Sequence, residues 1–118
     1  QPSAQTYSMY VTYQLPSSFK SFESGSTSIM GRTDSANSIV EYQVYKNDAA
    51  TGLTACGPLV SVATGAVASW QEGAATGTAD PSTCGFSPGN SVVFRINVTA
   101  SQNANAYIGN LNFIFSNR

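Results

Sequence analysis

The chain has 118 residues, a net charge of −1 and no histidine. Charged residues make up only 9% of it, against about 25% in ordinary globular domains, whereas 43 residues are Ser, Thr, Asn or Gln. Without a basic surplus to neutralise phosphates, a nucleic-acid partner is not expected. No apolar run reaches the ~20 residues that cross a bilayer, so membrane insertion is not expected either. Residues 1–118 are predicted to form a single domain.

Alternating apolar and polar residues predict antiparallel strands, and no long window has a helical period. In chain order, the first strand carries an apolar row expected to face the core: Tyr7, Met9, Val11, Tyr13 and Leu15. The Ser-rich segment 17–28 is predicted to be a connection whose two phenylalanines plug the edge of the fold. Clear strands are expected around 40–44, 92–98 and 107–115, and weaker ones at 27–31, 59–63 and 67–71. About seven to eight strands in this length predict an all-β fold, an antiparallel β-sandwich of jelly-roll type.

The two cysteines, Cys56 and Cys84, each precede a glycine in turn-rich sequence. We expect a disulfide between them, and the alternative is a pair of buried free thiols in a cytosolic protein. The bond would close a 28-residue separation and stabilise the fold by roughly 3.5 kcal/mol in the chain-entropy model. The small, turn-forming segment 73–85 is expected to depend on Cys84 for its order. A disulfide predicts an oxidising location, which is extracellular, at the cell surface or at a virion surface.

Catalysis and cofactors are not expected. The absence of histidine removes the common nucleophilic triads and zinc sites, and no glycine-rich nucleotide motif occurs. Calcium has weak candidates in the loop carboxylates Asp34, Asp48 and Asp80, but their spacing matches no calcium loop. Capping of turns by the same side chains explains them more simply. We therefore predict no metal.

Aromatic residues are the stronger candidates for a binding site. Trp70 is the only tryptophan and is followed by Gln71 and Glu72, a combination that can stack a sugar ring and hydrogen-bond its hydroxyls. Tyr10, on the polar face of the first strand, and Tyr45, at the end of another, are the tyrosines expected to be exposed. The alternative for Trp70 is a partly buried edge residue.

The sequence also contains one N-x-[ST] motif. Asn97 opens the sequon Asn97-Val98-Thr99 on the outward face of a predicted strand, so it is a weak candidate for N-glycosylation.

Three segments occur in a recognisable order. They are Tyr13-Gln14-Leu15-Pro16, then the strand at 39–45, and finally Gly89-Asn90-Ser91-Val92-Val93-Phe94-Arg95-Ile96 followed by Tyr107-Ile108-Gly109-Asn110 and a terminal aromatic strand. This pattern resembles the jelly-roll head domains that end phage tail fibres and bacterial surface fibres. The resemblance implies a non-enzymatic, usually trimeric domain that caps a fibre or binds a receptor or glycan. The cysteine pair is not part of that pattern.

The expected function is therefore a surface binding or adhesion module that recognises a glycan or a cell-surface receptor, as a homo-oligomer. The first alternative is a self-assembling, pilin-like filament subunit, because the terminal alternating segment 5–14 would suit exchange of a strand between subunits. The second alternative is a carbohydrate-binding module cut from a larger enzyme.

Overall fold

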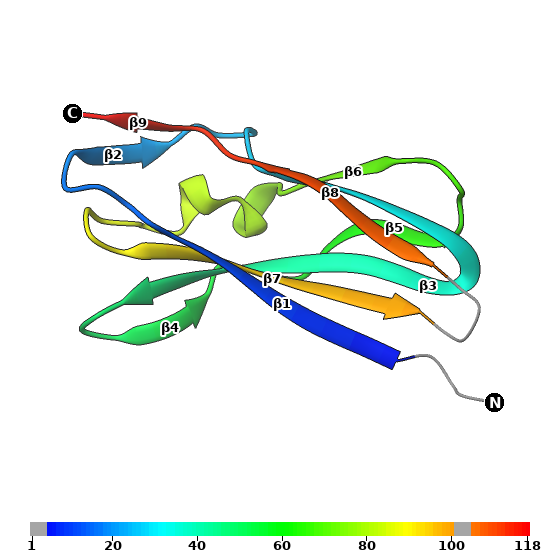
Figure 1. The fold of residues 1–118 in the computed structure, drawn as a ribbon. Helices are drawn as coiled ribbons and strands as arrows, with labels where there is room; N and C mark the ends of the chain where they lie inside the picture. The colour runs from blue at the N-terminus through cyan, green and yellow to red at the C-terminus, as the bar shows by residue number, and fades with distance from the viewer. Residues whose placement is uncertain (1–4, 101–104) are drawn as a thin grey trace.

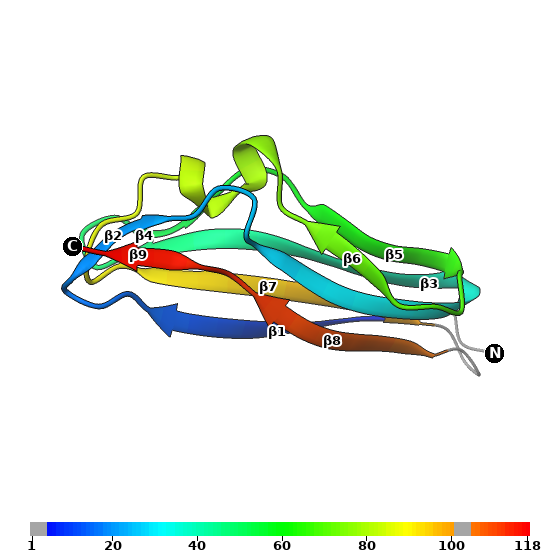
Figure 2. The same cartoon turned by 90° about the horizontal axis from the view of Figure 1, so that it is seen from above.

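The computed structural model describes residues 5–100 and 105–118. It contains two layers of antiparallel strands packed face to face (Figures 1 and 2), which confirms the predicted β-sandwich. Nine strands lie in the described part of the chain: β1 (Gln5–Gln14), β2 (Phe19–Phe22), β3 (Ser28–Asp48), β4 (Gly52–Ala55), β5 (Val60–Ala66), β6 (Gln71–Ala74), β7 (Ser91–Ala100), β8 (Ala106–Asn112) and β9 (Phe115–Asn117). Two 3-10 turns, η1 (Gly77–Ala79) and η2 (Pro81–Thr83), precede β7. Across the described residues, no helix has the length and apolar character needed to cross a membrane.

The 21-residue strand β3 belongs to both layers. Its first part pairs with β6 on one side and β8 on the other. Its second part pairs with β7 and with β5, and its end forms a hairpin with β4. β1 lies outside β7 at the edge of the same layer. The two strands expected at 27–31 and 40–44 are thus a single strand that changes layer.

The core lies between these layers. Val40, Tyr42 and Val44 of β3 alternate inward, as predicted, and meet the inward row of β7 that contains Phe94 and Ile96. The hydroxyl of Tyr42 donates a 2.7 Å hydrogen bond to the carbonyl oxygen of Gly73. Burial, helped by the negative charges of two nearby carboxylates, raises the pKa of Tyr42 well above its ordinary value near 10. The phenol is therefore held neutral in the core.

One end of the sandwich is closed by aromatic rings. β2 pairs with β9, and Phe19 and Phe22 of β2 are buried there. Their ring centroids lie 5.2 Å apart, and the ring of Phe22 lies 5.9 Å from that of Phe113. Edge-to-face pairs of this kind add to the gain from burial. The predicted aromatic plug is confirmed, although its residues form a strand rather than a loose connection.

The predicted disulfide is present, and it joins Cys56 to Cys84. The segment 73–85 that it anchors is well packed, because Ala79 and Asp80 are buried against the rest of the fold. The carboxylate of Asp80 accepts backbone N–H groups from Gly25 at 2.9 Å and from Ser82 at 3.0 Å. The contact with Gly25 ties the two 3-10 turns to the loop between β2 and β3.

Three local predictions are wrong. The strand expected at 107–115 is divided into β8 and β9, with residues 113–114 between them. In the apolar row of the first strand only Leu15 is buried, whereas Tyr7, Met9, Val11 and Tyr13 are between 41% and 65% exposed. β1 is an edge strand, and its inward face extends beyond the opposite layer. The strand expected at 67–71 is instead a tight turn, and β6 begins only at its last residue.

Candidate functional site

A tight turn between β5 and β6 presents Trp70 to solvent. Ala68 in this turn has a positive φ of 56°, a conformation that non-glycine residues seldom adopt. The N–H of Ala68 donates to the carbonyl oxygen of Thr33 in β3 at 2.8 Å, which fixes the turn on the sheet. Trp70, two residues later, is 48% exposed. A strained turn thus holds a large aromatic side chain partly in water.

Tyr107 of β8 lies beside this tryptophan. The two ring centroids are 6.4 Å apart with an interplanar angle of 49°, and Tyr107 is 43% exposed. A hollow of about 250 Å³ next to Trp70 is lined also by Met30, Gly109 and Asn110. A Cβ added to Gly109 would lie 3.1 Å from the indole, so the glycine lets the ring settle onto β8. We call the site formed by these four lining residues the Trp70 hollow, and Tyr107 lies beside it.

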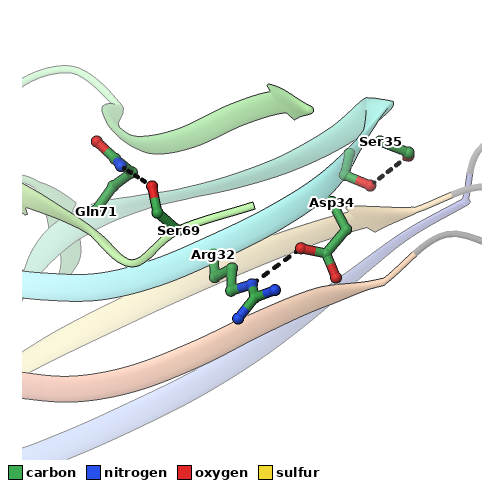
Figure 3. A network of polar contacts seen from close by, with 6 residues as sticks. Arg32, Asp34, Ser35, Ser69 and Gln71 are labelled. Atoms are coloured by element: carbon green, nitrogen blue, oxygen red, sulfur yellow. Dashed lines mark hydrogen bonds and ion pairs between the residues drawn. The ribbon is translucent and has the colours of Figure 1, made fainter. Parts of the chain in front are cut away.

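Polar side chains lie on both sides of this part of β3, with Arg32 and Asp34 on the side of β8 and Gln71 and Ser69 on the other side (Figure 3). Arg32 donates from Nε to Oδ1 of Asp34 at 3.0 Å, and its guanidinium carbon lies 5.9 Å from the centroid of the Tyr107 ring. Gln71 donates from Nε2 to Oγ of Ser69 at 2.9 Å. An apolar floor with donors and acceptors at its rim can hold a ligand that has both an apolar face and hydroxyl groups.

The structure brings together only part of the predicted site. Glu72 is exposed opposite Met30 in the β3–β6 pairing, on the face of the Trp70 hollow, whereas Gln71 pairs with Gly31 and lies on the other face. Tyr10 and Tyr45 lie on the outer face of the other layer and are not near it. Tyr10 is 59% exposed and pairs with Arg95, whereas the hydroxyl of Tyr45 accepts a 3.4 Å hydrogen bond from Nη1 of the same arginine.

Tyr107, Met30, Arg32 and Asp34 were not expected at this site, apart from the weak assignment of Asp34 to calcium. A signal for Tyr107 does exist in the sequence. It precedes the inward residue Ile108 in a strand, so alternation places its ring on the outer face.

Asn97 does not suit an N-glycan in the folded chain. The side chain is buried, its Oδ1 accepts a 2.7 Å hydrogen bond from Ser8, and its Nδ2 donates to Oε2 of Glu41 at 3.2 Å. Nδ2 is the atom that would carry the sugar. The outward orientation was predicted, but β1 covers the position.

The three weak calcium candidates lie apart and have other roles. Asp34 pairs with Arg32, Asp48 accepts the N–H of Ala50 at 2.8 Å, and Asp80 caps two backbone N–H groups. Within residues 5–100 and 105–118, no three His, Cys, Asp or Glu side chains are grouped as metal ligands would be.

No protein-family model, curated protein or solved structure gives a significant match to this chain.

Proposed function

We propose that this domain is a non-enzymatic surface module that binds a glycan at the Trp70 hollow. The observation that carries the proposal is the pair of half-exposed rings, Trp70 and Tyr107, lying 6.4 Å apart beside a hollow on the outer face of the β8–β3–β6 layer. Large aromatic side chains are normally withdrawn from water, and a turn that exposes one at the cost of backbone strain indicates a binding role.

The shape and chemistry of the hollow favour a sugar ring. A pyranose has one face of C–H groups, which can lie on the indole, and hydroxyl groups at its edge. The Arg32–Asp34 pair beside Tyr107 and the side chain of Asn110 are placed to hydrogen-bond such hydroxyls. The volume of about 250 Å³ lies below the ~300–1,000 Å³ typical of pockets for larger ligands. One ring of a glycan chain fits this size.

The proposal includes a location outside the cytosol, on a cell or virion surface. The disulfide is stable in an oxidising medium, and the low charge reduces non-specific adsorption. A trimeric fibre head, as the resemblance implies, and a module cut from a larger enzyme would both use the same hollow.

A filament subunit is the less supported alternative. In the structure β1 pairs with β7 of its own chain through ten consecutive residue pairs. Donation of β1 to a neighbouring subunit would have to break all of these pairs first.

The test uses the single tryptophan as its own reporter. Intrinsic fluorescence of Trp70 would be followed while a panel of mono- and oligosaccharides is titrated into the protein. A bound sugar should change the emission intensity or wavelength, and Tyr107→Ala should weaken affinity at least tenfold, about 1.4 kcal/mol. Gly109→Val should weaken it similarly, because the added atoms reach the indole and Met30. Tyr10→Ala, on the opposite layer, is the matched control and should leave affinity unchanged.

Trp70→Ala is measured by calorimetry instead, because it removes the fluorophore. It should abolish binding while the β-rich circular dichroism spectrum persists. The affinity should also change little between low and high salt, because stacking and neutral hydrogen bonds do not depend on charges that salt would screen. A sugar that binds Trp70→Ala as well as it binds the wild type, or a panel with no binder, would refute the proposal.

A further inference from the structure

The outer edge of β1 is an unprotected template for another strand. β1 pairs with β7 over ten residues without a break in register, and among the residues that the structure describes no strand pairs with its other edge. Edge strands are usually protected by charged residues, proline, a bulge or short length. Residues 5–14 contain no charged residue and no proline. Every protecting feature is missing from this edge.

The direction of the free backbone groups follows from one hydrogen bond. The N–H of Leu15 donates to the carbonyl oxygen of Asn90, next to β7, at 2.8 Å. Bonding alternates along an antiparallel strand, so the odd-numbered residues of β1 bond to β7. The even-numbered residues, from Thr6 to Gln14, therefore direct their N–H and C=O groups away from the sheet.

The side chains of β1 add apolar surface to this edge. Tyr7, Met9, Val11 and Tyr13 lie in one row, and Tyr10 projects on the opposite face. All five are between 41% and 65% exposed. Together they leave on the order of 450 Å² accessible, taking ~150–250 Å² for a large side chain.

We propose that two copies of this chain associate by pairing β1 with β1, antiparallel about a two-fold axis, so that their sheets become continuous. With the axis at Tyr10, the outward N–H and C=O groups of the even-numbered residues of one copy meet those of the other copy. Side chains on one face of each sheet then lie on the same face of the joined sheet. Met9 then lies opposite Val11 of the second copy, and Tyr7 lies opposite its Tyr13. A shift of the register by one residue would place apolar side chains against polar ones.

A second copy fits this edge better than a partner of different chemistry. The apolar row is self-complementary under the two-fold operation, as an isologous interface requires. The absence of charge in residues 5–14 removes like-charge repulsion between copies and leaves nothing to attract a charged partner. Among the described strands the other free edges are poorer, because β4 and β6 have only four residues each and the pairings of β3 with β5 and β8 have register breaks. The exposed area is below the ~800 Å² per partner of a standard interface, so the dimer should be reversible.

The first test measures the molar mass of the full chain by sedimentation equilibrium across a concentration series. The wild type should change reversibly from 12.3 kDa to twice that mass. Met9→Lys inserts a charge into the apolar row and should raise the dissociation constant at least tenfold. Leu53→Lys is the matched control, since Leu53 is also exposed on an edge strand, β4, and should not change the constant.

A second pair of variants addresses the backbone. Thr12→Pro removes one outward N–H without touching the bonds to β7 and should weaken dimerisation, whereas Thr12→Ala should not. Hydrogen exchange gives an independent signature. The amides of Ser8 and Tyr10 should become protected as protein concentration rises, while those of Met9 and Val11 are protected at all concentrations.

Several outcomes would overturn the proposal. These are a mass of 12.3 kDa up to the highest usable concentration, equal dissociation constants for Met9→Lys and Leu53→Lys, or growth beyond the dimer into a polymer. Circular dichroism checks that each variant is folded. Glycan binding at the Trp70 hollow is measured separately, so failure of one proposal does not affect the other.

Discussion

Replacing both cysteines should have a large and localised effect on stability. The disulfide closes a 28-residue separation that contains β5, β6, η1 and η2. In the chain-entropy model, losing a constraint of this size costs about 3.5 kcal/mol. Because small domains have only ~5–15 kcal/mol of total stability, the Cys56→Ala/Cys84→Ala variant should lose a quarter or more of it.

Urea denaturation, followed by both tryptophan fluorescence and circular dichroism, measures this loss. With a denaturant slope of ~1–3 kcal/mol/M, the midpoint should fall by roughly 1–3 M. Hydrogen exchange should accelerate most in the segment 73–85 and least in the pairing of β1 with β7. A loss below about 1 kcal/mol would refute the reasoning. Two titratable thiols in the unreduced wild type would refute the bond itself.

Two further substitutions probe the core and one close approach. Tyr42→Phe leaves the carbonyl oxygen of Gly73 without its phenol donor and should cost about 1–2 kcal/mol in urea denaturation. Because the pKa of Tyr42 is raised in the folded state, the unfolded chain ionises first, so stability should be level below about pH 10 and fall above it. The Phe variant should show a smaller fall, and identical pH profiles would contradict the assignment. Gly57→Ala should lower the free energy of unfolding by at least about 2 kcal/mol, because φ is +85° and the new Cβ would overlap the carbonyl of Thr78. Gly25→Ala is the control, since Gly25 also has a positive φ but faces open space. It should cost about half as much in the same denaturation assay.

The strands of the core could be predicted because apolar and polar residues alternate strongly along them. Val40, Tyr42 and Val44 are buried where the pattern placed them. The same pattern failed for Met9 and Val11, because alternation says which face of a strand is apolar but not whether another layer covers that face. The continuity of β3 across both layers was also missed, since its polar middle, 34–38, looks like a connection in the sequence.

The candidate site could be predicted only at its centre. Trp70 was chosen because it is the single tryptophan and has polar neighbours, and the structure leaves it 48% exposed, so its binding role stays a prediction. The aromatic residue that lies beside Trp70 is Tyr107, which was not singled out from the sequence. Trp70 lies in the turn before β6 and Tyr107 lies in β8, so only the pairing of β8 with β3 brings the two side chains together. No local pattern encodes such a non-local contact.

The placement of the first and last strands determines how the fold would carry mechanical load. The molecule is 51 Å long, and β1 begins at the end opposite to β9 (Figures 1 and 2). A pull between the two ends of the chain therefore acts along β1 rather than across it. The ten residue pairs between β1 and β7 would be strained together in shear, instead of opening one after another like a zipper. Such a domain resists extension in proportion to the whole length of its first strand, which is the property needed by a tether between two surfaces.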